Sequence, residues 1–236
     1  IVALIATTLA IGWFPTELPD RTPLQYALLG VITALFFFAS VLVHELAHSI
    51  VAVLRGIPVR KITLFLFGGI AEITREPSDP ATELRVAMAG PATSAALAAG
   101  FWIALLLMRG EGTRPGLQLA LLYLAWANSL LLAFNLLPGL PLDGGRIVRA
   151  LIWRGSGSLR RATFIASTSG KVIAGLMVAA GVLGLLTGAA IIPGLWFIFI
   201  ALFLSRTADA SYRQVLVREA LSGINVSSVM ITDVVS

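Results

Sequence analysis

The chain has 236 residues, of which 58% are hydrophobic and only 12% are charged. The charged share is about half that of a typical soluble domain, and several apolar runs reach the roughly 20 residues that a membrane-spanning helix needs. The composition therefore indicates an integral membrane protein and excludes the disordered and nucleic-acid-binding classes. The chain contains no cysteine, so it has no disulfide framework.

Six apolar segments follow one another along the chain, and each is expected to form a membrane helix. The first is expected to be the remnant of a longer span, the second is longer than a bilayer requires, and the sixth is short. The six segments cover about residues 1–13, 24–55, 83–108, 115–137, 169–186 and 191–205. We therefore predict an all-α membrane protein with about six transmembrane helices.

The stretch between the second and third segments has a different character. It reads IPVRKITLFLFGGIAEITREP, residues 57–77. Pro58, Gly68 and Gly69 interrupt any spanning helix, whereas β-branched and aromatic residues around a central Gly-Gly are typical of a hairpin. The apolar tip of this stretch favours a membrane-associated β-hairpin that packs on protein or lines a wet cavity. An ordinary surface hairpin is the alternative.

Basic residues are distributed unevenly between the two ends of the predicted helices. Lysine and arginine mark cytoplasmic loops. Eleven of them follow the even-numbered segments, against three on the opposite side: Arg55, Arg60, Lys61, Arg146, Arg149, Arg154, Arg160, Arg161, Arg206, Arg213 and Arg218, against Arg21, Arg109 and Arg114. This asymmetry predicts a multi-pass protein of the cell membrane with a cytoplasmic C-terminus, and it explains the net charge of +5.

Both histidines of the chain lie in the second apolar segment, in the pattern HELAH. His44 and His48 are four residues apart, so on a helix their imidazoles share one face and can bind one zinc ion. Glu45 lies beside that face, where a general base for a metal-bound water would be expected. Polar groups on a spanning helix indicate function, although a pair of satisfied core histidines is the alternative. If Arg55 marks the cytoplasmic interface, His48 lies roughly 10 Å below it, on the cytoplasmic half of the membrane.

A catalytic zinc site needs three protein ligands and one open position. The best candidate for the third ligand is Asp143, because it follows the fourth segment, which ends on the same side of the membrane as the second. Pro138 and Pro141 break the fourth helix just before it, and Gly144 and Gly145 allow close backbone approach. An N-cap of the following helix is the alternative role for Asp143.

Asn135 stands at the broken end of the fourth segment. Its amide could donate hydrogen bonds to a substrate carbonyl or to the oxyanion formed from it. An interhelical hydrogen bond is the alternative, as for Asn128.

The third segment contains small residues at intervals of four, in MAGPATSAALAAG. Gly90, Ser94 and Ala98 have the small-xxx-small spacing of closely packed membrane helices. We interpret this stretch as structural and pressed against the metal-bearing helix, with a direct role in substrate binding as the alternative.

Four motifs together resemble the site-2 protease family of intramembrane zinc metalloproteases. They are HELAH (44–48), FGGIAEI (67–73), AGPATS (89–94) and NLLPGLPLDGG (135–145), and the resemblance covers nearly the whole chain. It implies that one zinc ion per chain is bound by His44, His48 and Asp143. It further implies that Glu45 is the catalytic acid and base, and that Asn135 assists substrate or oxyanion binding.

The C-terminal stretch VSSVMITDVVS, residues 226–236, is similar to the opening of a CBS domain, a module that binds adenine nucleotides. This similarity implies the branch of the family that carries a C-terminal CBS pair. The expected organisation is a membrane protease domain over residues 1–213, followed by a linker and the start of a CBS domain over residues 214–236. A polar C-terminal tail is the alternative.

The chain is therefore expected to hydrolyse a peptide bond in or next to the transmembrane segment of a membrane-anchored protein. The family resemblance implies a transcription factor or an anti-sigma factor as the substrate. An unwound substrate strand is expected to pair with the edge of the predicted hairpin, at Ile62, Leu64, Leu66, Gly68 and Gly69. The alternatives are a transmembrane metal transporter, a non-catalytic nucleotide-sensing receptor, and a membrane metalloprotease of another fold with glutamate as the third ligand.

Overall fold

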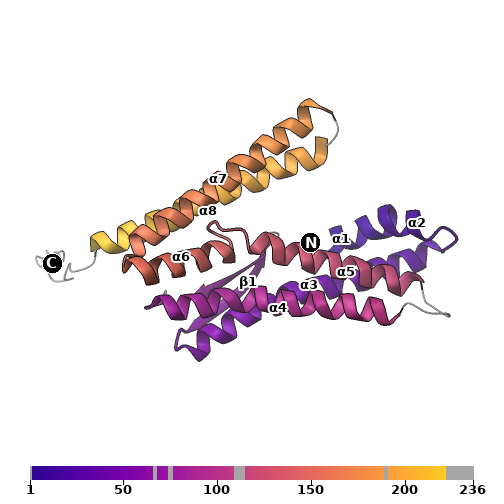
Figure 1. The fold of residues 1–236 in the computed structure, drawn as a ribbon. Coiled ribbons are helices and arrows are strands. Elements are labelled where there is room, and N and C mark those ends of the chain that lie inside the picture. Colours follow the sequence, from indigo (N-terminus) through magenta and orange to yellow (C-terminus); the bar gives the residue numbers. More distant parts are fainter. Residues whose placement is uncertain (1, 66–67, 74–76, 109–114, 189–190, 222–236) are drawn as a thin grey trace, which may run out of the picture. The chain divides into compact units, whose positions relative to one another are not determined.

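The computed structural model describes residues 2–65, 68–73, 77–108, 115–188 and 191–221, with the backbone alone for residues 60–73. The described chain is almost entirely helical, with one pair of strands after the longest helix (Figure 1). In chain order the elements are α1 (Val2–Thr8), a π-helical stretch η1 (Leu9–Trp13), α2 (Phe14–Glu17), α3 (Pro23–Leu54), β1 (Val59–Phe65), β2 (Gly68–Ile73), α4 (Pro80–Leu107), α5 (Pro115–Asn135), α6 (Asp143–Ser156), α7 (Leu159–Leu186) and α8 (Ile191–Leu221).

Five helices of the described chain are long and apolar enough to cross a membrane: α3, α4, α5, α7 and α8. The sixth of the predicted spans is not confirmed, because within the described residues the first apolar segment forms the shorter helical stretch Val2–Glu17. The chain is a multi-pass membrane protein built around five long apolar helices.

The two C-terminal helices are longer than the apolar pattern predicted. The helix α7 begins at Leu159 instead of near 169, and α8 continues to Leu221 instead of ending near 205. Their added turns are polar, and Arg160 forms a half-exposed ion pair with Glu219 at 3.6 Å. Hydropathy reports only the part of a helix that suits hydrocarbon, so it misses turns that continue into water.

The starts of α3 and α4 follow from local sequence. Thr22 forms a capping box with Gln25, because each side chain accepts a hydrogen bond from the other residue's N–H, at 3.3 and 3.1 Å. Asp79 caps α4 by accepting from the Thr82 N–H at 2.9 Å. Both helices then begin with a proline, which suits the first helical position.

The chain divides into two compact units. The first comprises residues 1–137 and 142–147, and the second comprises residues 138–141 and 148–236. Within the first unit, α3 packs against α1, α4 and α5, and α4 packs against α5 (Figure 1). A Cβ at Gly30 of α3 would lie 2.6 Å from the carbonyl oxygen of Ala6, so this glycine lets α1 lie directly on α3.

The strands β1 and β2 form a two-stranded antiparallel sheet in the first unit. Their register pairs Lys61 with Glu72 and Phe65 with Gly68. The segment predicted as a hairpin thus contains two paired strands, while its tip residues 66–67 lie outside the described chain. Association of this segment with the membrane stays a prediction.

In the second unit, α7 packs along α8. A Cβ at Gly181 would lie 2.6 Å from the carbonyl oxygen of Gly194, so the two backbones are in close contact there. Residues 138–141 belong to this unit and lie against α7, where the Leu140 N–H donates to the carbonyl oxygen of Ala166 at 3.0 Å. The helix α8 runs past the predicted domain boundary at 213, and the CBS-like motif at 226–236 lies outside the described residues.

Candidate metal centre

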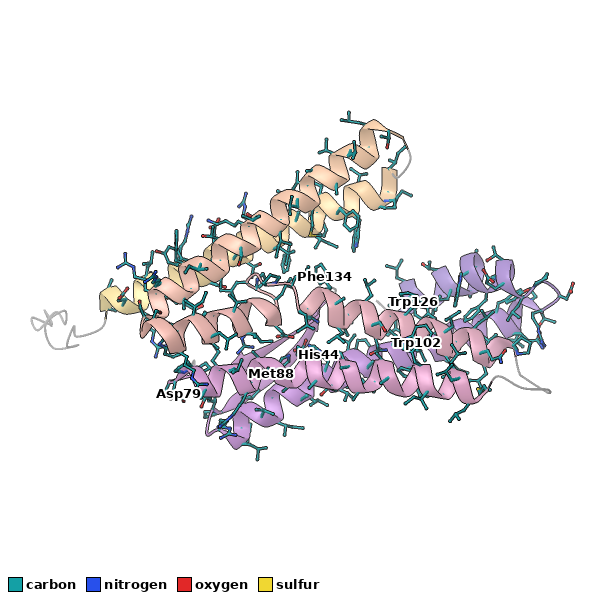
Figure 2. The ribbon with its side chains drawn as sticks, in the orientation of Figure 1. His44, Asp79, Met88, Trp102, Trp126 and Phe134 are labelled. Carbon is teal, nitrogen blue, oxygen red and sulfur yellow. The ribbon has the colours of Figure 1, made fainter. Side chains whose placement is uncertain are left out.

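The two histidines lie on one face of α3, in the interior of the first unit. His44 is 3% exposed and His48 is 6% exposed, and their Nε2 atoms are 3.2 Å apart. Figure 2 shows His44 between the start of α4, marked by Asp79, and the tryptophan pair of α4 and α5, Trp102 and Trp126. The i, i+4 spacing therefore directs both imidazoles to one point inside the bundle.

Asp143 completes a set of three donor groups. Its Oδ2 lies 3.2 Å from the Nε2 of His44 and 3.2 Å from the Nε2 of His48. Among the residues that the structure describes, these three form the group suited to a metal ion. Tetrahedral ligands at about 2.0–2.1 Å from zinc lie about 3.3 Å from one another. The three equal separations of 3.2 Å therefore fit a single zinc ion.

The chain reaches this point through a close backbone contact. The helix α5 ends at Asn135, and α6 begins at Asp143. A Cβ at Gly144 would lie 2.3 Å from the carbonyl oxygen of Leu136 and 2.5 Å from that of Leu137, so only glycine fits there. Gly144 thus allows the start of α6 to lie against the end of α5. The Asp143 carboxylate contacts both histidines, and a residue that served only as the N-cap of α6 would not need to do so.

The Asp143 carboxyl sits in a strongly perturbed environment. Burial opposes its ionisation, but the contacts with the imidazoles of His44 and His48 outweigh burial and hold the pKa of Asp143 well below its ordinary value. Asp143 is therefore an anionic donor at neutral pH, as a metal-ligating carboxylate must be.

The helix α4 supplies the far wall of the site through three residues spaced four apart, Val86, Gly90 and Ser94, which we call the α4 stripe. The carbonyl oxygen of Val86 lies 2.7 Å from the Nδ1 of His48, and the Ser94 Oγ lies 2.8 Å from the Nδ1 of His44. A Cβ at Gly90 would lie 2.1 Å from the Nε2 of His48. From the sequence, we interpreted the small residues of this stretch as structural and pressed against the metal-bearing helix, with substrate binding as the alternative. The packing of α4 on α3 is confirmed, whereas the contacts with the outer nitrogens of the histidines were not predicted.

The remaining predicted site residues are placed as follows. Glu45 is half-buried on α3, next to His44, and Asn135 is half-buried as the last residue of α5. Ile62, Leu64, Gly68 and Gly69 lie in β1 and β2, and Leu66 lies outside the described residues. Their roles stay predictions. Asn128 donates to the carbonyl oxygen of Leu124 and to the Ser40 Oγ of α3, so its part is an interhelical contact.

The described chain combines five apolar spans with a buried His-His-Asp donor set in its first unit, and these are the features of a membrane protein with a candidate metal centre. The chain belongs to Peptidase family M50, whose family model matches residues 32–118 and 110–179. This membership bears out the resemblance to site-2 proteases, while the CBS-containing branch stays a prediction.

Individual relatives agree with this assignment. The chain is 39% identical to Rip3 of Mycobacterium tuberculosis over 206 residues, which cover 87% of this chain and 52% of that protein. It is 40% identical to sll0528 of Synechocystis over 231 residues, which cover 95% of this chain and 58% of that protein. Both carry a provisional description as zinc metalloproteases. The chain spans about half the length of the curated relatives it matches.

A solved structure shows a similar fold. It is the site-2 protease from Methanocaldococcus jannaschii, which matches with a TM-score of 0.57 and 27% sequence identity, over 89% of this chain and 88% of that one. The likeness therefore extends over nearly the whole membrane bundle.

Proposed function

We propose that this chain is the membrane part of a zinc endopeptidase that cleaves a peptide bond in or next to the transmembrane segment of a membrane-anchored protein. The observation that carries the proposal is the donor set: three buried groups, each 3.2 Å from the other two, inside a bundle of spanning helices. Membership of Peptidase family M50 supports hydrolysis as the reaction.

The donor set would bind one zinc ion through three side chains. His44, His48 and Asp143 would hold the ion and leave its fourth position open. When bound, zinc supplies a Lewis acid that polarises a carbonyl and acidifies water towards a pKa of about 7. Val86 of the α4 stripe packs with Ala52 and Ile57 in a buried apolar cluster beside His48, which would limit how much water reaches the donors.

Glu45 would move the proton during the reaction. It is half-buried beside His44 on α3, so it combines access to the site with partial shielding from bulk water. Its carboxylate would accept a proton from the attacking water and deliver it to the leaving amine. Asn135 at the end of α5 would donate hydrogen bonds to the carbonyl oxygen as negative charge develops there.

The substrate would bind as an extended strand. A transmembrane helix hides its carbonyl groups in its own hydrogen bonds, and an unpaired backbone group in hydrocarbon costs several kcal/mol. The strands β1 and β2 directly follow the metal-bearing helix, and in the described two-stranded sheet each has an outer edge. An unwound substrate could pair with this edge over Ile62, Leu64, Leu66, Gly68 and Gly69.

The proposal includes the orientation of the protein in the membrane and the partners that it binds. The clustering of basic residues supports a site that opens to the cytoplasm and a cytoplasmic C-terminus. The substrate class would be membrane-tethered transcription factors or anti-sigma factors. The CBS-like tail would connect the protease to an adenine nucleotide.

The function is tested on the purified protein in nanodiscs, with a single-span reporter protein as the substrate. Removal of zinc by a chelator is expected to stop cleavage, and re-addition of zinc should restore it. Asp143→Ala should lower both zinc content and cleavage, because two histidines alone leave the ion short of a ligand. Metal analysis and a gel assay of the cleaved reporter measure the two quantities.

The matched control is Asp209→Ala, which removes a half-exposed carboxylate that pairs with Lys171 in the second unit. This control should keep its zinc. Cleavage that persists in thoroughly chelated protein, or an Asp143→Ala variant with full zinc content, would overturn the proposed assignment.

Pairing of the substrate with the strand edge is tested by proline substitution. Adjacent residues in a strand direct their N–H groups to opposite edges, so of Thr63→Pro and Leu64→Pro one removes a donor from the outer edge of β1. That variant is expected to lower kcat/KM by about 2- to 10-fold, the worth of one hydrogen bond. Its zinc content should not change. A complex in which the substrate stays helical and away from β1 would contradict this part of the proposal.

A further inference from the structure

The two histidines of the metal centre have different partners on their outer nitrogens. The Nδ1 of His48 faces the main-chain carbonyl oxygen of Val86 at 2.7 Å. The Nδ1 of His44 faces the side-chain hydroxyl of Ser94 at 2.8 Å. Both partners come from the α4 stripe. The partner of His48 is a backbone carbonyl, whereas the partner of His44 is a side-chain hydroxyl that a substitution can remove.

The carbonyl partner fixes which ring nitrogen of a neutral His48 carries the proton. A carbonyl oxygen only accepts hydrogen bonds, so the Nδ1 of His48 must carry the proton. The Nε2 of a neutral His48 then keeps its lone pair and points it at the donor set, where a metal ion binds. No side-chain substitution on α4 removes this carbonyl.

The hydroxyl partner leaves His44 with two options. A serine hydroxyl accepts from a protonated Nδ1 but can equally donate to an unprotonated one. When the Nε2 of His44 binds a metal ion, its Nδ1 must carry the proton, and the Ser94 Oγ must accept it. Ser94 has no exposed surface, so water does not reach the position to take over this role.

We propose that Ser94 is a positioning residue that holds His44 in the tautomer needed for zinc binding. The inference rests on the proposed function in one respect, namely that the donor set binds zinc. Ser94 would touch neither the metal nor the substrate, and it would act only through the His44 ring.

The consequence of losing the hydroxyl follows from the surroundings of His44. Without Ser94, a proton on Nδ1 would be a buried donor with no acceptor, which is unfavourable. A proton on Nε2 would instead meet the Oδ2 of Asp143, which lies 3.2 Å away. The ring would therefore take the Nε2–H tautomer, and that proton occupies the lone pair that zinc requires.

The test compares Ser94→Ala with a matched control, Ser40→Ala. Ser40 is also buried and lies one helical turn before His44. It donates to the carbonyl oxygen of Phe36 within α3 and accepts from Asn128 of α5 at 3.4 Å, so it too has a partner on a neighbouring helix but none on a histidine. Both variants remove one hydroxyl and leave a similar small space. Zinc affinity of the protein in nanodiscs is measured at fixed pH by competition with a chelator of known affinity.

A second measurement reads the tautomers directly. The chain has only two histidines, so ¹⁵N-histidine labelling produces four ring-nitrogen signals. In the zinc-free Ser94→Ala protein, we expect the proton of His44 on Nε2 and that of His48 still on Nδ1. The unchanged His48 signal, together with unchanged helix content, shows that the α4 backbone keeps its place.

The expected result is a zinc affinity about 10- to 100-fold lower in Ser94→Ala, as for other outer partners of metal ligands, and no such loss in Ser40→Ala. Wild-type zinc affinity in Ser94→Ala, or a His44 proton that stays on Nδ1 there, would overturn this inference alone. A wild-type protein that binds zinc but cleaves nothing would overturn the proposed function and leave the inference standing. A wild-type protein that binds no zinc would overturn both.

Discussion

Gly90→Ala is expected to abolish zinc binding while the helices remain folded. The added Cβ would lie 2.1 Å from the Nε2 of His48 and 2.6 Å from the Nε2 of His44, which are the donor atoms themselves. The rings cannot turn aside without breaking their hydrogen bonds to Val86 and Ser94. Alanine is also the better helix former by about 0.8–1 kcal/mol, so helix α4 itself gains rather than loses stability from the change. Metal analysis and circular dichroism measure the two effects.

The same helix offers a matched control. A Cβ at Gly100 would meet no atom within 4 Å, so Gly100→Ala makes the identical change in α4 without touching the site. This control should bind zinc as the unsubstituted protein does. Full zinc content in Gly90→Ala would show that α4 does not lie against the donor atoms.

Glu45→Gln is expected to keep zinc and to lose cleavage. The amide has nearly the same shape as the carboxylate but cannot accept the proton of the attacking water, and loss of a general base typically lowers the rate by about 10² to 10⁴-fold. Zinc content should not change, because Glu45 stands outside the donor set of His44, His48 and Asp143. Metal analysis beside the reporter assay distinguishes the two quantities.

This variant also separates a protease from a metal transporter. A transporter needs the three donors but has no use for a general base, so zinc flux through it would survive Glu45→Gln. The same substitution at Glu219, in the half-exposed ion pair with Arg160, serves as the control and should leave cleavage intact. A Glu45→Gln protein that cleaves at the normal rate would rule out the proposed mechanism.

Several features could be predicted from sequence because they depend on the length of a segment, on the helical repeat or on the side of the membrane where a segment ends. The apolar runs define spans by length, since a bilayer has a known thickness. His44 and His48 face one way because four residues make about one helical turn. Asp143 could be paired with the histidines across 95 residues because the second and fourth segments are predicted to end on the same side of the membrane. Few polar groups lie at that depth, so Asp143 was the best candidate. The first inference uses a length, the second a periodicity, and the third the side of the membrane on which each segment ends. None of the three depends on how the helices pack.

Other features were decided only by tertiary structure. Hydropathy predicted an end of α8 near 205, yet the helix continues to Leu221 through polar turns that carry the Arg160–Glu219 ion pair. The roles of Gly90 and Ser94 were also out of reach, because a small residue at a four-residue interval fits any close helix contact equally well. In the structure α4 packs on α3, and its small residues contact the two imidazoles. The Ser94 Oγ lies 2.8 Å from the Nδ1 of His44, which is 50 positions away in the sequence. Such a contact depends on the axial offset between the two packed helices, and the sequence pattern of neither helix determines that offset.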